Sequence, residues 1–300
     1  MREFLVFQSL WAMQDHNGQT DQPLEAQLDK IVAAGFDGVT DHFWLPQPAA
    51  RLHQAARDRG LQIEGQVFPR SVDDLAAALD VATQYGCHHL TLQADVRPRS
   101  LSQAVKLAEG WQRLAEQVDF PVLLETHRYR LTNDLFFTLD LLAEMPDLKL
   151  LADLSHYVVG RELPVQASAE DDAMIHTILR NSWGFHGRVA CSEQVQVPIS
   201  FAQHQPWLQR FLGWWQYGIE DWLARTDTPQ SLSFTCELGP PPYAITGADG
   251  RDISDRWAEA LMLKTLMREV WQGCRDRSEQ GVATATGRGK STSYTGQSAE

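Results

Sequence analysis

Short apolar runs rich in β-branched and aromatic residues alternate along the chain with amphipathic stretches. The runs that predict strands cover residues 3–13, 37–43, 61–68, 88–94, 121–127, 148–156, 184–189 and 231–238. The stretches between them carry apolar residues at three- and four-residue spacing, which predicts helices, for example over 23–35, 71–86 and 100–118. Gly35, Gly60 and Gly86 stand just after helical patterns, where a left-handed C-cap favours glycine.

Eight strands, each followed by a helix, are the element order of a (β/α)8 TIM barrel. The main rival is a doubly wound open α/β sheet, which usually has fewer strands and a glycine-rich phosphate loop after the first one. Here the first strand leads into WAMQDHNGQT, which contains no GxGxxG. We therefore expect a single barrel domain over residues 1–276. Residues 277–300 are rich in Ser, Thr and Gly and poor in bulky apolar residues, so we expect a low-complexity, disordered tail.

The composition is that of a globular protein with a full core, because 43% of the 300 residues are hydrophobic and 22% are charged. The formal net charge of −13 would repel a polyphosphate backbone, so we expect no nucleic-acid partner. No apolar run approaches the roughly 20 residues that span a bilayer, and the N-terminus lacks the features of a signal peptide. The four cysteines form no CxxC pair, which indicates reduced thiols and a cytoplasmic location.

Polar side chains collect toward the ends of four successive predicted strands, which contribute Glu125, Asp153, His186 and Glu237 in that order. In a TIM barrel the chemistry lies at the C-terminal ends of the strands, so these side chains should meet at one rim. Three carboxylates and one imidazole suit a single divalent ion, namely Mn²⁺, Mg²⁺, Co²⁺ or, less typically, Zn²⁺. Cys236 adjoins Glu237 but should point to the other side of its strand, which disfavours cysteine ligation.

The combination of ETHR (125–128), ADLSH (152–156), HGRV (186–189) and CELGPPPY (236–243) resembles the xylose isomerase-like TIM barrel superfamily, the sugar phosphate isomerase/epimerase group. The resemblance runs from the first strand to the last helix and leaves out the tail. It implies one divalent metal bound by the four side chains named above, and substrate oxygens held by His156 and Arg188. One subgroup reads HARVG after strand seven, whereas this chain reads HGRVA, so Gly187 and Ala190 can alter the loop that follows.

Three further residues are candidates for substrate binding because of their place at the rim. His42 and Gln66 close strands two and three, where they could meet sugar hydroxyls. Tyr243 follows three prolines, which fix φ and favour a rigid wall with the phenol facing the pocket. The alternative for this proline run is a simple turn into the last helix.

Other polar residues have two readings of equal standing or nearly so. His127 and Arg128 follow Glu125 directly, so they could contact the substrate or only neutralise that carboxylate. Arg188 could hold substrate oxygens or be a structural partner for Asp153. The sequence pattern leaves these choices open.

The sequence supports a metal-dependent isomerase or epimerase that acts on a sugar, a keto-sugar or a sugar phosphate. Glu125 and Glu237 would flank a carbon next to a carbonyl, one removing its proton and the other returning it. A sugar lyase or dehydratase on the same site is the alternative, because fold analogy does not choose the outcome. An apurinic endonuclease-like nuclease fits less well, since strand three ends in Gln66 and not histidine, and so does a barrel used only for binding. The Trp-rich segments 207–227 and 254–274 could form a homo-oligomer interface or pack on the barrel.

Overall fold

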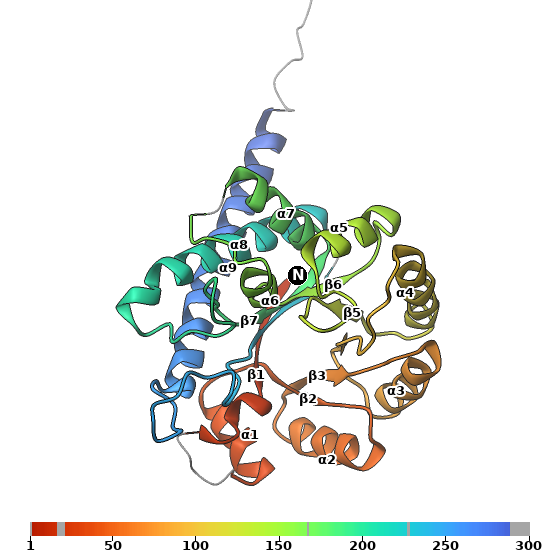
Figure 1. Cartoon of the computed structure of the whole chain (residues 1–300), viewed down its shortest axis with the longest axis vertical. Helices are drawn as coiled ribbons and strands as arrows, with labels where there is room; N and C mark the ends of the chain where they lie inside the picture. The colour runs from red at the N-terminus through yellow and green to blue at the C-terminus, as the bar shows by residue number, and fades with distance from the viewer. Residues whose placement is uncertain (1, 17–21, 167, 227–228, 289–300) are drawn as a thin grey trace, which may run out of the picture.

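The computed structural model of the protein describes residues 2–16, 22–166, 168–226 and 229–288. Its strands form one closed parallel barrel inside a ring of helices (Figure 1). The strands follow one another in chain order, and β8 pairs back onto β1. The strands are β1 (Glu3–Ser9), β2 (Gly38–His42), β3 (Gln62–Val67), β4 (His89–Leu92), β5 (Val122–Glu125), β6 (Leu150–Ala152), β7 (Ser182–Gly187) and β8 (Ser231–Cys236). The predicted single (β/α)8 barrel is confirmed.

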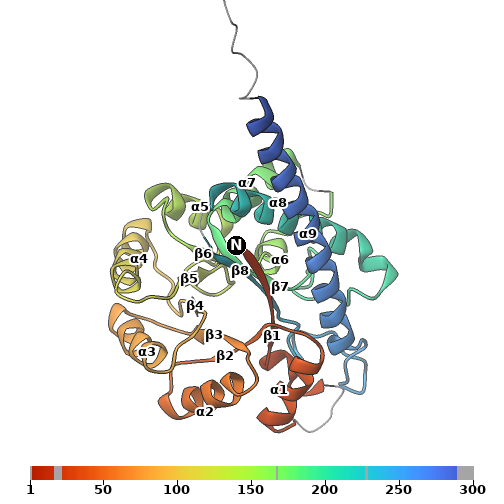
Figure 2. The ribbon, with the colours of Figure 1, turned by 180° about the vertical axis from the view of Figure 1, so that it is seen from behind.

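Helices surround the barrel on its outer side (Figures 1 and 2). They are α1 (Leu24–Ala33), α2 (Pro46–Arg57), α3 (Val72–Tyr85), α4 (Leu101–Ala115), α5 (Leu135–Glu144), α7 (Ala169–Arg180), α8 (Gln205–Arg225) and α9 (Arg256–Arg288). Shorter turns follow three strands, namely η1 (Trp11–Met13), α6 (Ser155–Gly160) and η3 (Ala202–His204). Within the described ranges, no helix combines the length and the apolarity that crossing a bilayer requires.

Helix boundaries follow the local signals in the sequence. The Ser71 hydroxyl accepts a hydrogen bond from the backbone N–H of Asp74 at 3.1 Å, and the Asp74 carboxylate accepts one from the N–H of Ser71 at 3.1 Å. This reciprocal capping box satisfies N–H groups that the first turn of α3 leaves unpaired. Gly35, Gly60 and Gly86 have φ angles of +72°, +69° and +80°, as expected for residues that end helices in the left-handed region.

The last helix continues into the segment predicted to be a disordered tail. α9 extends to Arg288, and Figure 2 shows its end reaching beyond the ring of helices. The Ser/Thr/Gly content suggests that the helix ends at 276. Residues 277–288 also contain several residues that favour helix, namely Ala, Glu, Gln and Arg, which explains why the helix continues. Residues 289–300, the remainder of the predicted tail, lie outside the described residues.

Side chains along each strand alternate between the barrel interior and the surrounding helices. Phe234 of β8 packs against Trp215 of α8, with ring centroids 5.0 Å apart. The thiol of Cys236 lies 3.5 Å from a backbone carbonyl of α9, so this cysteine points outward as predicted. Thr235, between them, points inward and donates a hydrogen bond to Glu64 of β3 across the interior.

The Trp-rich helices α8 and α9 pack on the barrel with their indoles inside. Trp214, Trp215 and Trp222 of α8 are at most 2% exposed. Trp271 of α9 stacks on Phe4 of β1, with ring centroids 5.2 Å apart. Of the two roles that the sequence leaves open for these segments, the structure assigns these four rings to core packing.

The sixth strand is shorter than its apolar run predicts. β6 ends at Ala152, and residues 155 and 156 belong to α6 instead of the predicted strand. The side chain of Asp153 explains the change, because its Oδ1 accepts hydrogen bonds from the backbone N–H and the hydroxyl of Ser155, at 3.0 and 2.5 Å. His156 therefore projects from a helical turn at the rim and does not close the strand.

We expect Ser71→Ala to lower the free energy of unfolding by about 1 kcal/mol, because it removes the hydroxyl that caps α3. Asp80→Ala is the matched control, since Asp80 is exposed on the same helix and alanine has the higher helix propensity. Urea unfolding followed by circular dichroism measures both. Equal stability of the Ser71→Ala variant and the unchanged protein would show that the capping box contributes nothing.

Candidate metal centre

The four side chains predicted to bind a metal come together at the carboxyl end of the barrel. Glu125 is the last residue of β5, His186 belongs to β7, and Asp153 and Glu237 directly follow β6 and β8. One potential ligand atom from each lies within 4.8 Å of the other three. Each of the four residues is at most 3% exposed. Parallel strands thus bring residues that are distant in sequence to one buried point.

Three polar atoms of this cluster lack a hydrogen-bond partner among the described residues, namely Glu125 Oε1, Glu125 Oε2 and His186 Nδ1. His186 Nδ1 lies 3.4 Å from Glu125 Oε1 and 3.1 Å from Glu237 Oε2, distances that bring both carboxylates to the same nitrogen. Buried polar atoms are nearly always satisfied in folded proteins. Carboxylate oxygens and an imidazole nitrogen that converge on one buried point fit a divalent cation as their common partner.

The other nitrogen of His186 is held by a carboxylate inside the barrel. His186 Nε2 lies 2.8 Å from Oε1 of Glu64, a residue of β3 with no exposed surface. Burial alone would lower the pKa of His186, but the neighbouring carboxylates, Glu237 first among them, hold it well above its usual value. Burial alone would likewise raise the pKa of Glu64, yet the nearby imidazoles hold it well below its usual value. In the metal-free protein the imidazole therefore holds a proton on each of its two nitrogens and carries a positive charge.

Arg188 links two of the four candidate ligands and is only 1% exposed. Its Nη1 donates to Oδ2 of Asp153 at 2.7 Å, and its Nη2 donates to Oε2 of Glu237 at 2.6 Å. Gln66 donates to Oε1 of Glu237 at 2.9 Å. Burial alone would raise the pKa of Glu237, but the adjacent imidazole and guanidinium lower it to about 2. Arg188 does pair with Asp153, one of its two predicted roles, whereas substrate contact by Arg188 or Gln66 stays a prediction.

Glu125 differs from Glu237 in its surroundings. Burial raises the pKa of Glu125 to about 7; attraction from His186 opposes this shift, while repulsion from the other carboxylates adds to it. Its closest described partner is His186 Nδ1, 3.4 Å from Oε1, and neither oxygen has a partner with hydrogen-bond geometry among the described residues. Glu125 therefore takes up and releases a proton near neutral pH, while Glu237 stays ionised.

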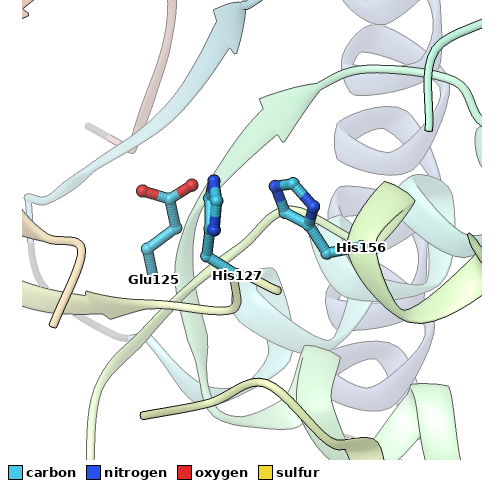
Figure 3. Close-up of side chains that lie close together, drawn as sticks. All are labelled: Glu125, His127 and His156. Carbon is cyan, nitrogen blue, oxygen red and sulfur yellow. The ribbon is translucent and has the colours of Figure 1, made fainter. Parts of the chain in front are cut away.

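Glu125 also belongs to a second set of potential ligand atoms, with His127 and His156 (Figure 3). The two imidazoles lie side by side, with centroids 3.8 Å apart. Burial is the main cause that lowers the pKa of His127 to about 3 and that of His156 well below its usual value, so both rings are neutral. Guanidinium nitrogens of Arg128 and Arg188 lie 3.1 and 3.4 Å from the two nitrogens of His156. This positive charge disfavours a second cation and favours oxygen acceptors.

His127, Arg128 and Tyr243, all predicted to bind substrate, lie on this side of the cluster. His127 Nδ1 donates to the backbone carbonyl of Arg128 at 2.5 Å, which leaves Nε2 as an acceptor. Arg128 donates to Nδ1 of His156, so that ring carries its proton on Nε2. The guanidinium carbons of Arg128 and Arg188 lie 4.7 and 4.8 Å from the ring centroid of Tyr243. Fixed N–H groups therefore border the candidate ligands, and contact with substrate stays a prediction for all three residues.

His42 contacts a different group of residues. It is exposed at the end of β2, and its ring centroid lies 4.7 Å from that of Trp44 and 5.3 Å from that of Phe68. Trp44 and Phe68 also meet edge to face at 5.2 Å. His42 is thus part of an aromatic group at the ends of β2 and β3, and a role in binding sugar hydroxyls stays a prediction.

Three buried side chains that shape the site are not among the candidates that the sequence indicates. Glu64 is one, and its charge within the predicted strand 61–68 is the signal that could have identified it. The Thr126 hydroxyl donates to the carbonyl of Asp153 and accepts its N–H, both at 2.9 Å. The Thr132 hydroxyl donates to the carbonyl of Glu125 at 2.6 Å. The two threonines thus fix the backbone of two candidate ligands, and nothing in the sequence distinguishes them from other threonines.

No family model and no curated protein sequence matches the chain. Among solved structures, an L-ribulose 3-epimerase is 14% identical with a TM-score of 0.55, covering 92% of this chain and 97% of that one. A xylose isomerase-like TIM barrel protein from Mycobacterium smegmatis in complex with magnesium is 10% identical with a TM-score of 0.54, covering 89% and 97%. An AP endonuclease, family 2, from Brucella melitensis is 13% identical with a TM-score of 0.52, covering 80% and 94%. The chain therefore has the fold of xylose isomerase-like TIM barrels, which epimerases and an endonuclease share.

We expect metal binding to release protons, and to release more of them at lower pH. In the metal-free protein His186 holds a proton at neutral pH, and Glu125 holds one below a pH of about 7. Both protons must leave before these atoms can bind a cation, so metal affinity should fall as the pH drops. Release should rise from about one to about two protons per ion as the pH falls through about 7. Calorimetry with Mn²⁺ in buffers of different ionisation enthalpy measures this number.

Two variants check the assignment of those protons. Glu125→Gln removes the group that titrates near pH 7, so its proton release should no longer change across that range. An Asp153→Ala, His186→Ala double variant should bind no stoichiometric ion. Retention of one ion per chain by the double variant would contradict the four-residue site.

Proposed function

We propose that the protein is a divalent-metal-dependent sugar isomerase or epimerase that moves a proton on a carbon next to a carbonyl. The observation that carries this proposal is the convergence of Glu125 and Glu237 on His186 Nδ1, in a buried cluster with Asp153. The fold similarity to an L-ribulose 3-epimerase supports the substrate class, a small ketose. The same similarity extends to an endonuclease, so the site chemistry and not the fold selects the activity.

Glu125, Asp153, His186 and Glu237 would hold one ion of Mn²⁺, Mg²⁺, Co²⁺ or Zn²⁺. When bound, such an ion polarises a carbonyl and its neighbouring hydroxyl, which makes the proton on the adjacent carbon more acidic. The residues of the chain would then bind the sugar, keep water away and transfer the proton.

The two glutamates would have different parts in proton transfer. Glu125, if it holds the ion through one oxygen, would keep a second oxygen without a hydrogen-bond partner, and this oxygen would remove the proton and hold it. Glu237 is fixed through Gln66 and Arg188 and is ionised, so it approaches the carbon from a set direction. Hydrogen bonds to Glu237 reduce its basicity, which makes Glu125 the stronger candidate for the residue that abstracts the proton.

Sugar oxygens would be held by the N–H groups beside the cluster. The proton on His156 Nε2 and the N–H groups of Arg188 lie next to each other, with the two nitrogens 3.4 Å apart. Both donors also face Oδ2 of Asp153, 2.7 Å from Arg188 Nη1 and 3.5 Å from His156 Nε2, so a sugar hydroxyl or carbonyl oxygen would share them with that carboxylate. His127 would add an acceptor through its Nε2 and so match a hydroxyl donor.

We expect the manganese-loaded protein to wash deuterium from heavy water into at least one ketose. The probes are L-ribulose and the other ketopentoses and ketohexoses, and mass spectrometry with chromatography follows both exchange and products. Glu125→Gln should reduce exchange by roughly 10²–10⁴-fold, the usual share of general acid–base catalysis. Glu237→Gln should lose turnover too, together with part of the metal affinity, because its charge also neutralises Arg188.

Glu259→Gln is the matched control for these variants. Glu259 is a buried glutamate, 3% exposed, whose carboxylate accepts hydrogen bonds from Ser200 away from the cluster. Its exchange rate should equal that of the unchanged protein. Loss of water or of a substituent instead of isomerisation would identify a lyase on the same site. Near-normal turnover in both glutamate variants, or no exchange with any ketose, would reject the proposal.

A further inference from the structure

The interior of this barrel contains a cluster of polar side chains where TIM barrels usually place layers of branched apolar side chains. Below the candidate metal ligands lie Glu64 and Thr235, which are hydrogen-bonded to each other, and His89 and Ser233. All four residues are at most 1% exposed. Burying polar groups this deeply costs free energy of folding unless each group is hydrogen-bonded. The presence of these four residues in the interior therefore points to a function.

Glu64 is the centre of this interior network. Its Oε1 accepts a hydrogen bond from the Thr91 hydroxyl at 2.7 Å and lies 2.8 Å from His186 Nε2. Its Oε2 accepts a hydrogen bond from the Thr235 hydroxyl. His89 Nε2 lies 3.7 Å from Oε1 and completes the surroundings. Partners from β4, β7 and β8 therefore hold the carboxylate of this β3 residue in one orientation.

This orientation decides which nitrogen of His186 can face the metal ligands. A carboxylate can only accept from the ring, so the contact at 2.8 Å requires the proton of His186 to sit on Nε2. Nδ1 is then the nitrogen with a free lone pair once the second proton has left, and Nδ1 is the atom that approaches Glu125 and Glu237. In the other tautomer the lone pair would face a carboxylate and the N–H would face the cation.

We propose that Glu64 is a positioning residue of the metal centre, which fixes the Nε2–H tautomer of His186 and turns Nδ1 toward the metal. The inference rests on the proposed function only in so far as the cluster binds a divalent ion. It assigns no contact with substrate to Glu64. A carboxylate that accepts the second N–H of a metal-binding histidine both orients the ring and strengthens its remaining nitrogen as a ligand.

The tautomer can be read directly in the unchanged protein. With Zn²⁺ bound and the histidines labelled with ¹⁵N, long-range proton–nitrogen spectra distinguish a metal-bound Nδ1 from a protonated Nε2. The His186 signals are assigned by their absence from His186→Ala. We expect Nδ1 to be bound to metal and Nε2 to be protonated. Coordination through Nε2, or a proton on Nδ1, would overturn the inference.

Metal affinity in variants tests the role of the carboxylate itself. Glu64→Gln keeps an acceptor for the Nε2 proton but loses the charge, so its affinity should fall by roughly 10-fold. Glu64→Leu removes the acceptor, so the fall should approach roughly 100-fold and the His186 signals should report a mixture of tautomers. Chelator competition with Zn²⁺ gives the dissociation constants. Thr235→Val, which removes only one hydrogen bond to Glu64, should weaken binding less and in the same direction.

Glu259→Gln serves here as the control for replacing a buried glutamate, and it should bind Zn²⁺ as the unchanged protein does. If Glu64 had a purely structural role, both variants would melt at a lower temperature. Their affinity for Zn²⁺ would then not decrease further from Glu64→Gln to Glu64→Leu. Unchanged affinity in folded Glu64→Gln and Thr235→Val would overturn the inference even if Glu64→Leu does not fold. None of these measurements uses a sugar, so a failure of the proposed activity leaves their outcome intact.

Discussion

Buried negative charge is the constraint on which the rest of the site depends. Four carboxylates, those of Glu64, Glu125, Asp153 and Glu237, lie within or next to one cluster with almost no exposure to water. Such a set is tolerated only when opposite charges offset the loss of hydration. Arg188 supplies one fixed positive charge, and the proton on His186 supplies another. These two positive charges hold the candidate ligands in place and offset part of their negative charge even without an ion.

The proposed binding of a divalent ion would be an exchange of protons for metal. The protons on His186 and Glu125 together carry the charge of one divalent ion, so the exchange leaves the charge of the cluster unchanged. Arg188 donates hydrogen bonds to Asp153 and to Glu237, two of the four candidate ligands, and its charge separates their carboxylates. A neutral or apolar residue at position 188 would leave two buried carboxylates facing each other.

The rim residues could be predicted from the sequence, whereas the interior network could not. Glu125 and Glu237 end apolar runs, and a barrel brings every strand end to the same rim, so their meeting follows from topology. Glu64 lies inside a run that alternates polar and apolar residues, which also describes a strand with one face in water. Closure of the barrel turns that polar face inward. Only the three-dimensional partners, Thr91 and Thr235, distinguish the two cases.

His156 and Arg188 mark a second limit of the sequence. The apolar run of strand six continues past Ala152, so periodicity extends the strand through His156. The strand ends earlier because the Asp153 side chain accepts a hydrogen bond from the backbone of the next turn. A pattern of apolar residues does not reveal this side-chain hydrogen bond. For Arg188 the sequence predicts that the guanidinium binds oxygen atoms, but it does not identify them. A guanidinium binds a carboxylate of the protein and a substrate oxygen equally well.

The pairing of β1 with β8 also determines at which stage of folding the candidate site can form. β1 meets its second neighbour only after most of the chain has been synthesised, and such long-range pairing is slow compared with local helix formation. Until then β1 presents an open edge that can pair with other chains. Glu237 directly follows β8, the strand that closes the sheet. The full set of candidate ligands thus exists only in a chain whose barrel has closed, so a bound ion would stabilise completed molecules and not partly folded ones.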